Sequence, residues 1–172
     1  MPDRPKRRPG LFFLRLFLGG CSAFLLSLSF PPQRWWFLAC GAFVPSFLAP
    51  VNSPGSAFFQ GWFTGLVFYL LTLSWLVKVA GPVYLLLPLY LSFFWGIFFL
   101  LIKGLPERGR IFSAASAWFF LEIIVAHFLT GFPWLPLGLS QYSSRWLLPV
   151  VSLVTVFGLS SLLMMFNLLL AT

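Results

Sequence analysis

Long runs of hydrophobic residues, separated by short breaks of proline, glycine and charged residues, dominate this chain. Most runs approach the roughly 20 residues that a helix needs to cross the hydrocarbon core of a bilayer. The breaks predict about six helical spans, at residues 11–30, 35–49, 58–79, 83–102, 111–129 and 147–171. We therefore expect residues 11–172 to form an all-α integral membrane bundle of about six transmembrane helices, behind a basic segment at residues 1–10.

Proline and glycine indicate where these helices stop, bend or pack closely. The first span stops after Phe30 at a pair of prolines, because proline cannot continue a helix. The second span is short and contains Pro45, which favours a tilted, re-entrant or protein-buried segment. Gly61 and Gly65, four residues apart in the third span, allow another helix to approach closely. Pro88 predicts a kink in the fourth span.

The composition agrees with a membrane location. Hydrophobic residues fill 60% of the 172 positions and charged residues only 8%, whereas soluble domains carry roughly 25% charged residues. The net charge of +8 raises the question of nucleic-acid binding, but four of the eleven basic residues lie within the first eight positions. The others are scattered between apolar runs, so no basic face follows a phosphate backbone, and we expect no nucleic-acid partner.

Basic residues also predict the orientation, because cytoplasmic loops carry an excess of lysine and arginine. With the N-terminus inside, seven basic residues fall on the cytoplasmic side: Arg4, Lys6, Arg7, Arg8, Lys103, Arg108 and Arg110. Three fall on the outer side: Arg34, Lys78 and Arg145. We therefore expect a multi-pass protein with a cytoplasmic N-terminus and an outward-facing loop over residues 130–146.

The two cysteines, Cys21 and Cys40, lie in apolar runs without metal-ligand spacing, and we interpret them as small apolar residues. The segment Leu18 to Cys21 behind a basic head offers an alternative, because it resembles a lipoprotein signal with its lipidated cysteine. Arg15 interrupts the apolar region of that signal, and the residues after Cys21 stay apolar, so we favour an uncleaved first helix.

Glu122 is the most informative single residue. At about 1.5 Å per residue it lies roughly 16 Å into its helix, near the middle of the bilayer. An ionisable group there costs roughly 2.5–3.5 kcal/mol on insertion scales, so it should face the bundle interior. Glu122 is either a polar anchor in a substrate cleft or a carboxyl group bonded to a helix neighbour for packing. His127 points elsewhere and fits an interfacial position.

The chain offers no complete catalytic or metal centre. Neither cysteine has a base nearby in sequence, and no Gly-x-Ser-x-Gly elbow occurs. The only acidic residues are Asp3, Glu107 and Glu122, and His127 is the only histidine. We therefore expect no catalytic residue in this chain, no metal site and no cofactor.

The outer loop, Thr130 to Tyr142, contains two glycines and two prolines, which give it a fixed, non-helical path. Phe132, Trp134 and Tyr142 would place their rings at the depth of the lipid headgroups. The loop is then either a rigid aromatic platform for lipid chains or headgroups, or an interfacial belt without a ligand.

This loop resembles the signature of bacterial apolipoprotein N-acyltransferases, since residues 130–141 read Thr-Gly-Phe-Pro-Trp-Leu-x-Leu-Gly-x-Ser-Gln. Further matches occur in the same order: Leu28 to Pro32 with Trp35 and Trp36, Gly61 to Gly65 with Trp75, and Glu122 eight residues before Thr130. The resemblance implies that Phe132, Pro133, Trp134, Ser140 and Gln141 are lipid-side or structural residues. The family commonly has arginine where this chain has Val125.

The resemblance implies a function in the bacterial inner membrane. The family transfers an acyl chain from a phospholipid to the N-terminal amine of diacylglyceryl-cysteine in an apolipoprotein, through a thioester on a nitrilase-like domain. This chain resembles only the membrane half that precedes that domain, so we expect it to hold lipid substrates while a nitrilase-like domain does the chemistry. One alternative is a non-catalytic scaffold or lipid-binding paralogue. Another is half of a small transporter, but the sequence shows no convincing internal repeat of the kind that such a protein would need.

Overall fold

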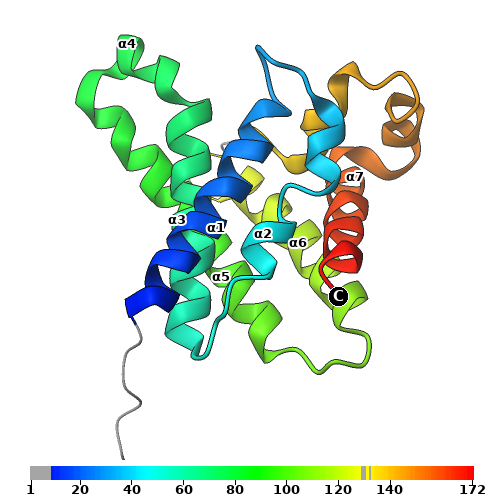
Figure 1. The fold of residues 1–172 in the computed structure, drawn as a ribbon. Coiled ribbons are helices and arrows are strands. Elements are labelled where there is room, and N and C mark those ends of the chain that lie inside the picture. The colour runs from blue at the N-terminus through cyan, green and yellow to red at the C-terminus, as the bar shows by residue number, and fades with distance from the viewer. Residues whose placement is uncertain (1–8, 129–130, 132) are drawn as a thin grey trace, which may run out of the picture.

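The computed structural model describes residues 9–128, 131 and 133–172, which form a bundle of helices (Figure 1). The part described is helical, with 3₁₀ turns and loops between the helices. Among the described residues, four helical segments are long and apolar enough to cross a membrane: Gly10–Leu28, Ser74–Gly104, Arg110–His127 and Leu148–Leu170. The prediction of an all-α membrane bundle is confirmed.

Helices α1 (Pro9–Leu28), α3 (Pro54–Thr72) and α5 (Leu86–Gly104) form one side of the bundle, with α3 between the other two. Glycine allows the closest approach: a Cβ atom on Gly61 would collide with the backbone oxygen of Trp95, and one on Gly65 would lie 2.9 Å from the Trp95 ring. The predicted close packing at this glycine pair is therefore confirmed, and its partner is α5.

Helix α3 begins and ends earlier than the predicted span at residues 58–79. Pro54 stands at its start, and Ser53 and Ser56 exchange hydrogen bonds in a capping box, which fixes the first turn four residues earlier. After Thr72 the chain leaves the helix in three short pieces: η2 (Ser74–Leu76), α4 (Val77–Ala80) and η3 (Gly81–Leu85). They form a projection at one end of the bundle (Figure 1).

The predicted kink at Pro88 is wrong. Helix α5 begins at Leu86, so Pro88 lies in its first turn. The first four N–H groups of a helix have no partner within it, and proline's missing N–H therefore removes no helix hydrogen bond there. An interruption that the sequence did not predict lies in α7 (Leu148–Leu170), where Thr155 has φ 66° and ψ 171°.

The second predicted span, residues 35–49, is a broken segment. It consists of η1 (Trp36–Cys40) and one turn of helix, α2 (Val44–Phe47). Non-helical backbone at membrane depth needs partners inside the protein, and Asn167 of α7 supplies two of them. Its side-chain oxygen accepts a hydrogen bond from Phe43 N at 2.8 Å, and its nitrogen donates to Ala39 O at 2.8 Å.

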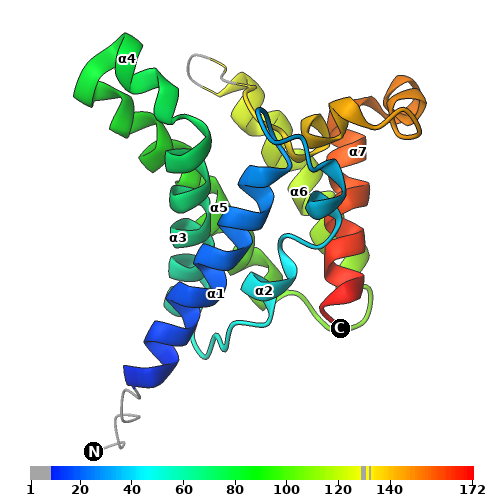
Figure 2. The same cartoon turned by 45° about the horizontal axis from the view of Figure 1, so that its top comes forward.

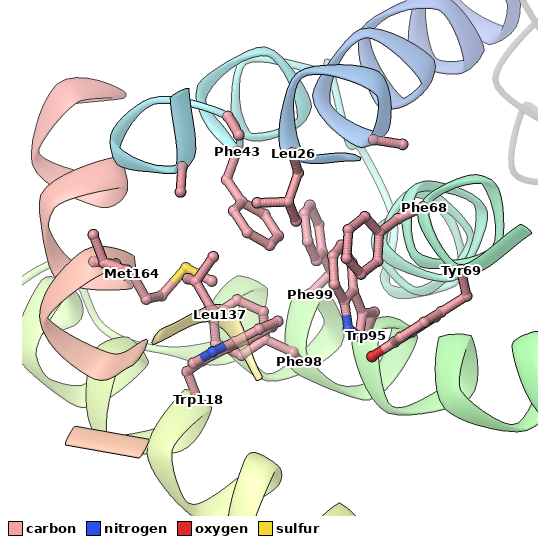
Figure 3. Packing of buried hydrophobic residues seen from close by; sticks show 14 of the residues in the cluster. Leu26, Phe43, Phe68, Tyr69, Trp95, Phe98, Phe99, Trp118, Leu137 and Met164 are labelled. Atoms are coloured by element: carbon pink, nitrogen blue, oxygen red, sulfur yellow. The ribbon is translucent and has the colours of Figure 1, made fainter. Parts of the chain in front are cut away.

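An aromatic core fills the space between the helices (Figure 3). The Phe43 ring lies 5.0 Å from that of Trp95 and 5.5 Å from that of Trp118, and Phe68 stacks on Trp95 at 5.3 Å. Rings on the outside are exposed, including Phe13 and Phe17 of α1. A bilayer would solvate these outer rings directly, so they agree with a lipid-facing surface.

Candidate functional site

The Glu122 carboxyl group lies on α6 (Arg110–His127) and faces the interior of the bundle. Its Oε1 atom accepts two hydrogen bonds, from Trp118 Nε1 at 2.9 Å and from the backbone N–H of Leu137 at 2.8 Å. The other oxygen, Oε2, is buried and has no hydrogen-bond partner. One oxygen of Glu122 is therefore bonded within the bundle, whereas a role of this residue as an anchor for a substrate stays a prediction.

The segment that contains Gly138 is hydrogen-bonded to α7. Gly138 donates its N–H to Ser160 Oγ at 2.7 Å, and that hydroxyl donates to the carbonyl of Val156 at 3.1 Å. The Ser160 hydroxyl also lies beside the Glu122 carboxyl group. A Cβ atom on Gly138 would collide with Val156 O, so only glycine allows this close contact.

A pocket opens beside Glu122 and is lined mainly by apolar side chains. About 560 Å³ of space inside it is not occupied by any atom, including the open space at its mouth. It draws its walls from α1, α3, α5, α6 and α7 and from the loop before η4 (Leu137–Ser143). The lining residues are Leu26, Phe30, Phe68, Tyr69, Leu91, Phe94, Trp95, Trp118, Leu121, Glu122, Val125, Pro133, Trp134, Leu135, Pro136, Leu137 and Phe157.

Three of the predicted site residues meet at this pocket: Glu122, Pro133 and Trp134. The Trp134 ring stacks on Trp75 with ring centres 5.5 Å apart and planes 14° apart. Because Trp75 belongs to η2, this stack joins the loop to the projection that contains α4. Phe132, another predicted site residue, lies outside the described residues.

Ser140 and Gln141 are placed elsewhere and do not line the pocket. Both are buried in η4, where Gln141 donates to Ser140 Oγ at 2.9 Å and to the carbonyl of Trp36 at 3.0 Å. Ser140 in turn donates to Leu137 O at 2.7 Å. These contacts tie the loop to the broken second segment, so the two residues hold the pocket wall in place from behind.

Sequence reasoning missed the aromatic wall contributed by α3 and α5. Tyr69 and Trp95 both line the pocket, and the Tyr69 hydroxyl lies beside the indole nitrogen of Trp95 (Figure 3). Gly65, whose Cβ would contact the Trp95 ring, was the available signal, because a small residue on one helix admits a large ring from its neighbour.

The remaining candidates lie apart from Glu122. Cys21 and Cys40 are free and half-buried, and neither lines the pocket. His127 is exposed at the end of α6, with Nδ1 2.8 Å from the carbonyl of Ile123. Within the described residues, no group of three His, Cys, Asp or Glu side chains is placed to hold a metal ion.

The fold and the pocket define a helical membrane protein with a mainly apolar cleft that contains one buried carboxyl oxygen. The family model for the apolipoprotein N-acyltransferase N-terminal domain matches residues 22–169. The chain belongs to this family, as its loop motif indicated.

Relatives named apolipoprotein N-acyltransferase support this assignment. The chain is 34% identical over 160 residues to the protein of Geobacter metallireducens, covering 85% of this chain and 31% of that protein. It is 33% identical over 151 residues to the protein of Pseudomonas aeruginosa strain PAO1, covering 78% and 29% of the two chains. It is 28% identical over 170 residues to the protein of Pasteurella multocida, covering 90% of this chain and 30% of that protein. The chain thus spans about a third of the length of the curated relatives it matches.

Proposed function

We propose that this chain forms the membrane part of an apolipoprotein N-acyltransferase. The complete enzyme would transfer an acyl chain from a phospholipid to the N-terminal amine of a diacylglyceryl-modified apolipoprotein. The role of this segment is to hold an acyl chain of a lipid substrate in the pocket beside Glu122. The observation that carries the proposal is an apolar pocket whose lining contains one carboxyl oxygen without a partner.

The chemistry of the pocket fits a lipid better than a polar metabolite. Phe94, Leu121 and Val125 provide apolar walls for an acyl chain. Glu122 Oε2 could bond to an amine, hydroxyl or amide near the reacting end of a lipid, and an unpaired buried polar atom gains most from such a partner. Two N–H donors fix the other oxygen, so the carboxyl group is already oriented when a ligand arrives.

We further propose that the acyl-transfer chemistry takes place on a nitrilase-like domain and not on this segment. Cys21 and Cys40 lie in apolar helices away from the pocket, so no thiol here faces the proposed lipid. Recovery of a radiolabelled acyl thioester on either cysteine of the purified chain would contradict this part of the proposal.

The proposed location is the bacterial inner membrane with the N-terminus in the cytoplasm. Lys103, Arg108 and Arg110 lie at the end of the bundle where α5 stops and α6 starts. The loops that contain Arg34 and Arg145 lie at the opposite end (Figure 2). An outward-facing Glu122 pocket would then open on the side where lipoproteins are exposed.

Photo-crosslinking tests the lipid pocket directly. The purified chain is incubated in detergent with a phosphatidylethanolamine that carries a diazirine on its acyl chain, irradiated, and mapped by mass spectrometry. We expect adducts on Phe94, Val125 and Leu135 that unlabelled phospholipid competes away. Adducts confined to outward rings such as Phe13 and Phe17 would refute acyl-chain binding in the pocket.

Complementation tests the enzymatic role and separates it from a lipid-binding scaffold. The chain is co-expressed with the remaining two-thirds of the Geobacter metallireducens relative in a strain depleted of its own N-acyltransferase. We expect N-acylation to be restored, and Glu122→Gln to reduce it, since the amide replaces a hydrogen-bond acceptor by a donor. Glu107→Gln, in an exposed loop, is the matched control and should have no effect. Lipid adducts in the pocket without any N-acylation would favour the scaffold.

A further inference from the structure

A second cavity lies among the loop after α2, the end of α5, the start of α6 and the end of α7, and shares no lining residue with the pocket beside Glu122. Figure 1 shows that α5 ends and α6 begins at the end of the bundle opposite the projection that contains α4. About 1050 Å³ of space inside it is not occupied by any atom, including the open space at its mouth, and this is more than in the pocket beside Glu122. Its lining residues are Ser46, Phe47, Val51, Ala57, Phe99, Ile102, Lys103, Arg110, Ile111, Leu168, Ala171 and Thr172.

Two cationic side chains stand on this lining without a carboxylate partner. Lys103 Nζ donates a hydrogen bond to the carbonyl of Val51 at 3.0 Å, which holds the ammonium group at the cavity but leaves its charge uncompensated. Arg110 is exposed at the start of α6. In the described part of the chain the side-chain carboxylates are those of Glu107 and Glu122, and neither forms an ion pair with these cations. Two cations in the lining of one cavity attract an anion.

The loop on the other side of the cavity is held in place from α1. Arg15 Nε donates to the carbonyl of Pro50 at 2.6 Å, next to the Val51 carbonyl that Lys103 contacts. Basic residues of α1 and α5 thus hold neighbouring carbonyl groups of one loop. The cavity rim is therefore fixed by two independent hydrogen bonds, and Lys103 is oriented before any ligand binds.

Apart from the cations, Ser46 and Thr172, the lining of the cavity is apolar. Phe99 and Ile102 of α5 and Leu168 of α7 are buried and contribute to its wall. A small inorganic anion would fill only the charged rim and leave this wall exposed. A ligand with an anionic head and a hydrocarbon tail matches both parts, and basic pockets between transmembrane helices are known to bind lipid head groups in this way.

We propose that this cavity binds one anionic phospholipid, with its phosphate at Lys103 and Arg110 and an acyl chain along the apolar wall. The site is distinct from the pocket beside Glu122 because the two share no lining residue. The lipid bound here is structural: it undergoes no reaction and fills the space among α2, α5, α6 and α7. This inference does not depend on the acyltransferase role.

Native mass spectrometry of the purified chain tests the proposal. The chain carries a C-terminal tag, which keeps the terminal carboxylate away from Lys103 and Arg110. It is titrated with phosphatidylglycerol, with phosphatidylcholine of the same acyl chains, and with inorganic phosphate. We expect one phosphatidylglycerol to bind in preference to phosphatidylcholine. Phosphatidylglycerol binding should weaken roughly fivefold in Lys103→Gln or Arg110→Gln and roughly 30-fold in the double variant, if each cation contributes as basic residues do at anionic membranes.

Arg108→Gln is the matched control, because Arg108 has the same charge, is exposed between α5 and α6 and does not line the cavity. It should leave phosphatidylglycerol binding unchanged. Equal binding of the two phospholipids, or an equal loss in Arg108→Gln, would overturn the proposal. Displacement of phosphatidylglycerol by millimolar phosphate would also overturn it, since the site would then recognise a free anion. Arg110 is exposed, so Arg110→Gln keeps the test valid if the double variant fails to fold.

Discussion

Replacing Asn167 by alanine should detach the broken second segment from α7. The Asn167 side chain is fully buried, and it satisfies the carbonyl of Ala39 in η1 and the N–H of Phe43 just before α2. Its third hydrogen bond, to Leu163 O at 2.9 Å, goes to a carbonyl that the α7 ladder also uses. Only the first two bonds therefore lack a substitute in the variant.

The loss in the free energy of unfolding comes from the unpaired N–H of Phe43 and carbonyl of Ala39. Hydrogen bonds between membrane helices contribute about 0.6 kcal/mol on average and up to about 1.7 kcal/mol. A buried group left without any partner costs about 1–3 kcal/mol. The truncated side chain adds a small cavity. We therefore expect Asn167→Ala to lower the free energy of unfolding by about 2–4 kcal/mol.

Reversible unfolding by SDS in mixed micelles, followed by circular dichroism, measures this change. Leu169→Ala is the control on the same helix, because Leu169 is 51% exposed and makes no such bond. Maleimide labelling gives a local readout: Cys40, next to Ala39, should react faster in the variant, whereas Cys21 in α1 should not. A loss no larger than that of Leu169→Ala, with unchanged Cys40 labelling, would refute the reasoning.

Two further predictions concern helix packing and orientation. Gly61→Ala should destabilise the bundle by about 1–3 kcal/mol, because its Cβ would collide with Trp95 O. The control Gly20→Ala should be neutral or slightly stabilising, because no atom lies within 4 Å of the new Cβ. Equal effects of the two substitutions in the SDS assay would contradict this explanation. Alkaline phosphatase fused at Ser143 should be active and a fusion at Gly109 inactive, and the reverse pattern would refute the cytoplasmic N-terminus.

The hydrophobic pattern was sufficient to predict the membrane bundle because lipid exposure requires long apolar helices. It predicted helix ends less well where local chemistry decides them. The capping box at Ser53 was readable in the sequence and would have moved the start of α3 to Pro54. The end of α3 at Thr72 was not readable, because the sequence after Thr72 stays mainly apolar and has no proline or glycine before Gly81. The interruption at Thr155 has no glycine or proline at that position to indicate it.

The candidate site was predictable only in part. Glu122 stood out because a charge in an apolar helix is costly, and Pro133 and Trp134 stood out by resemblance to a family motif. Which residues face them depends on helix packing, so Tyr69 and Leu137 could not be assigned from sequence. Leu137 matters through its backbone N–H, which no side-chain pattern reveals.

Three polar side chains inside the bundle have the same physical role. Irregular backbone survives inside a membrane only where other parts of the protein satisfy its N–H and C=O groups. Asn167 does this for the second segment, Glu122 for Leu137, and Gln141 for the carbonyl of Trp36. In the proposed function, the Glu122 carboxyl group supports the backbone with one oxygen and would bind the lipid with the other. Substitutions at Glu122 should therefore alter stability and lipid binding together, whereas those at Asn167 should alter stability first.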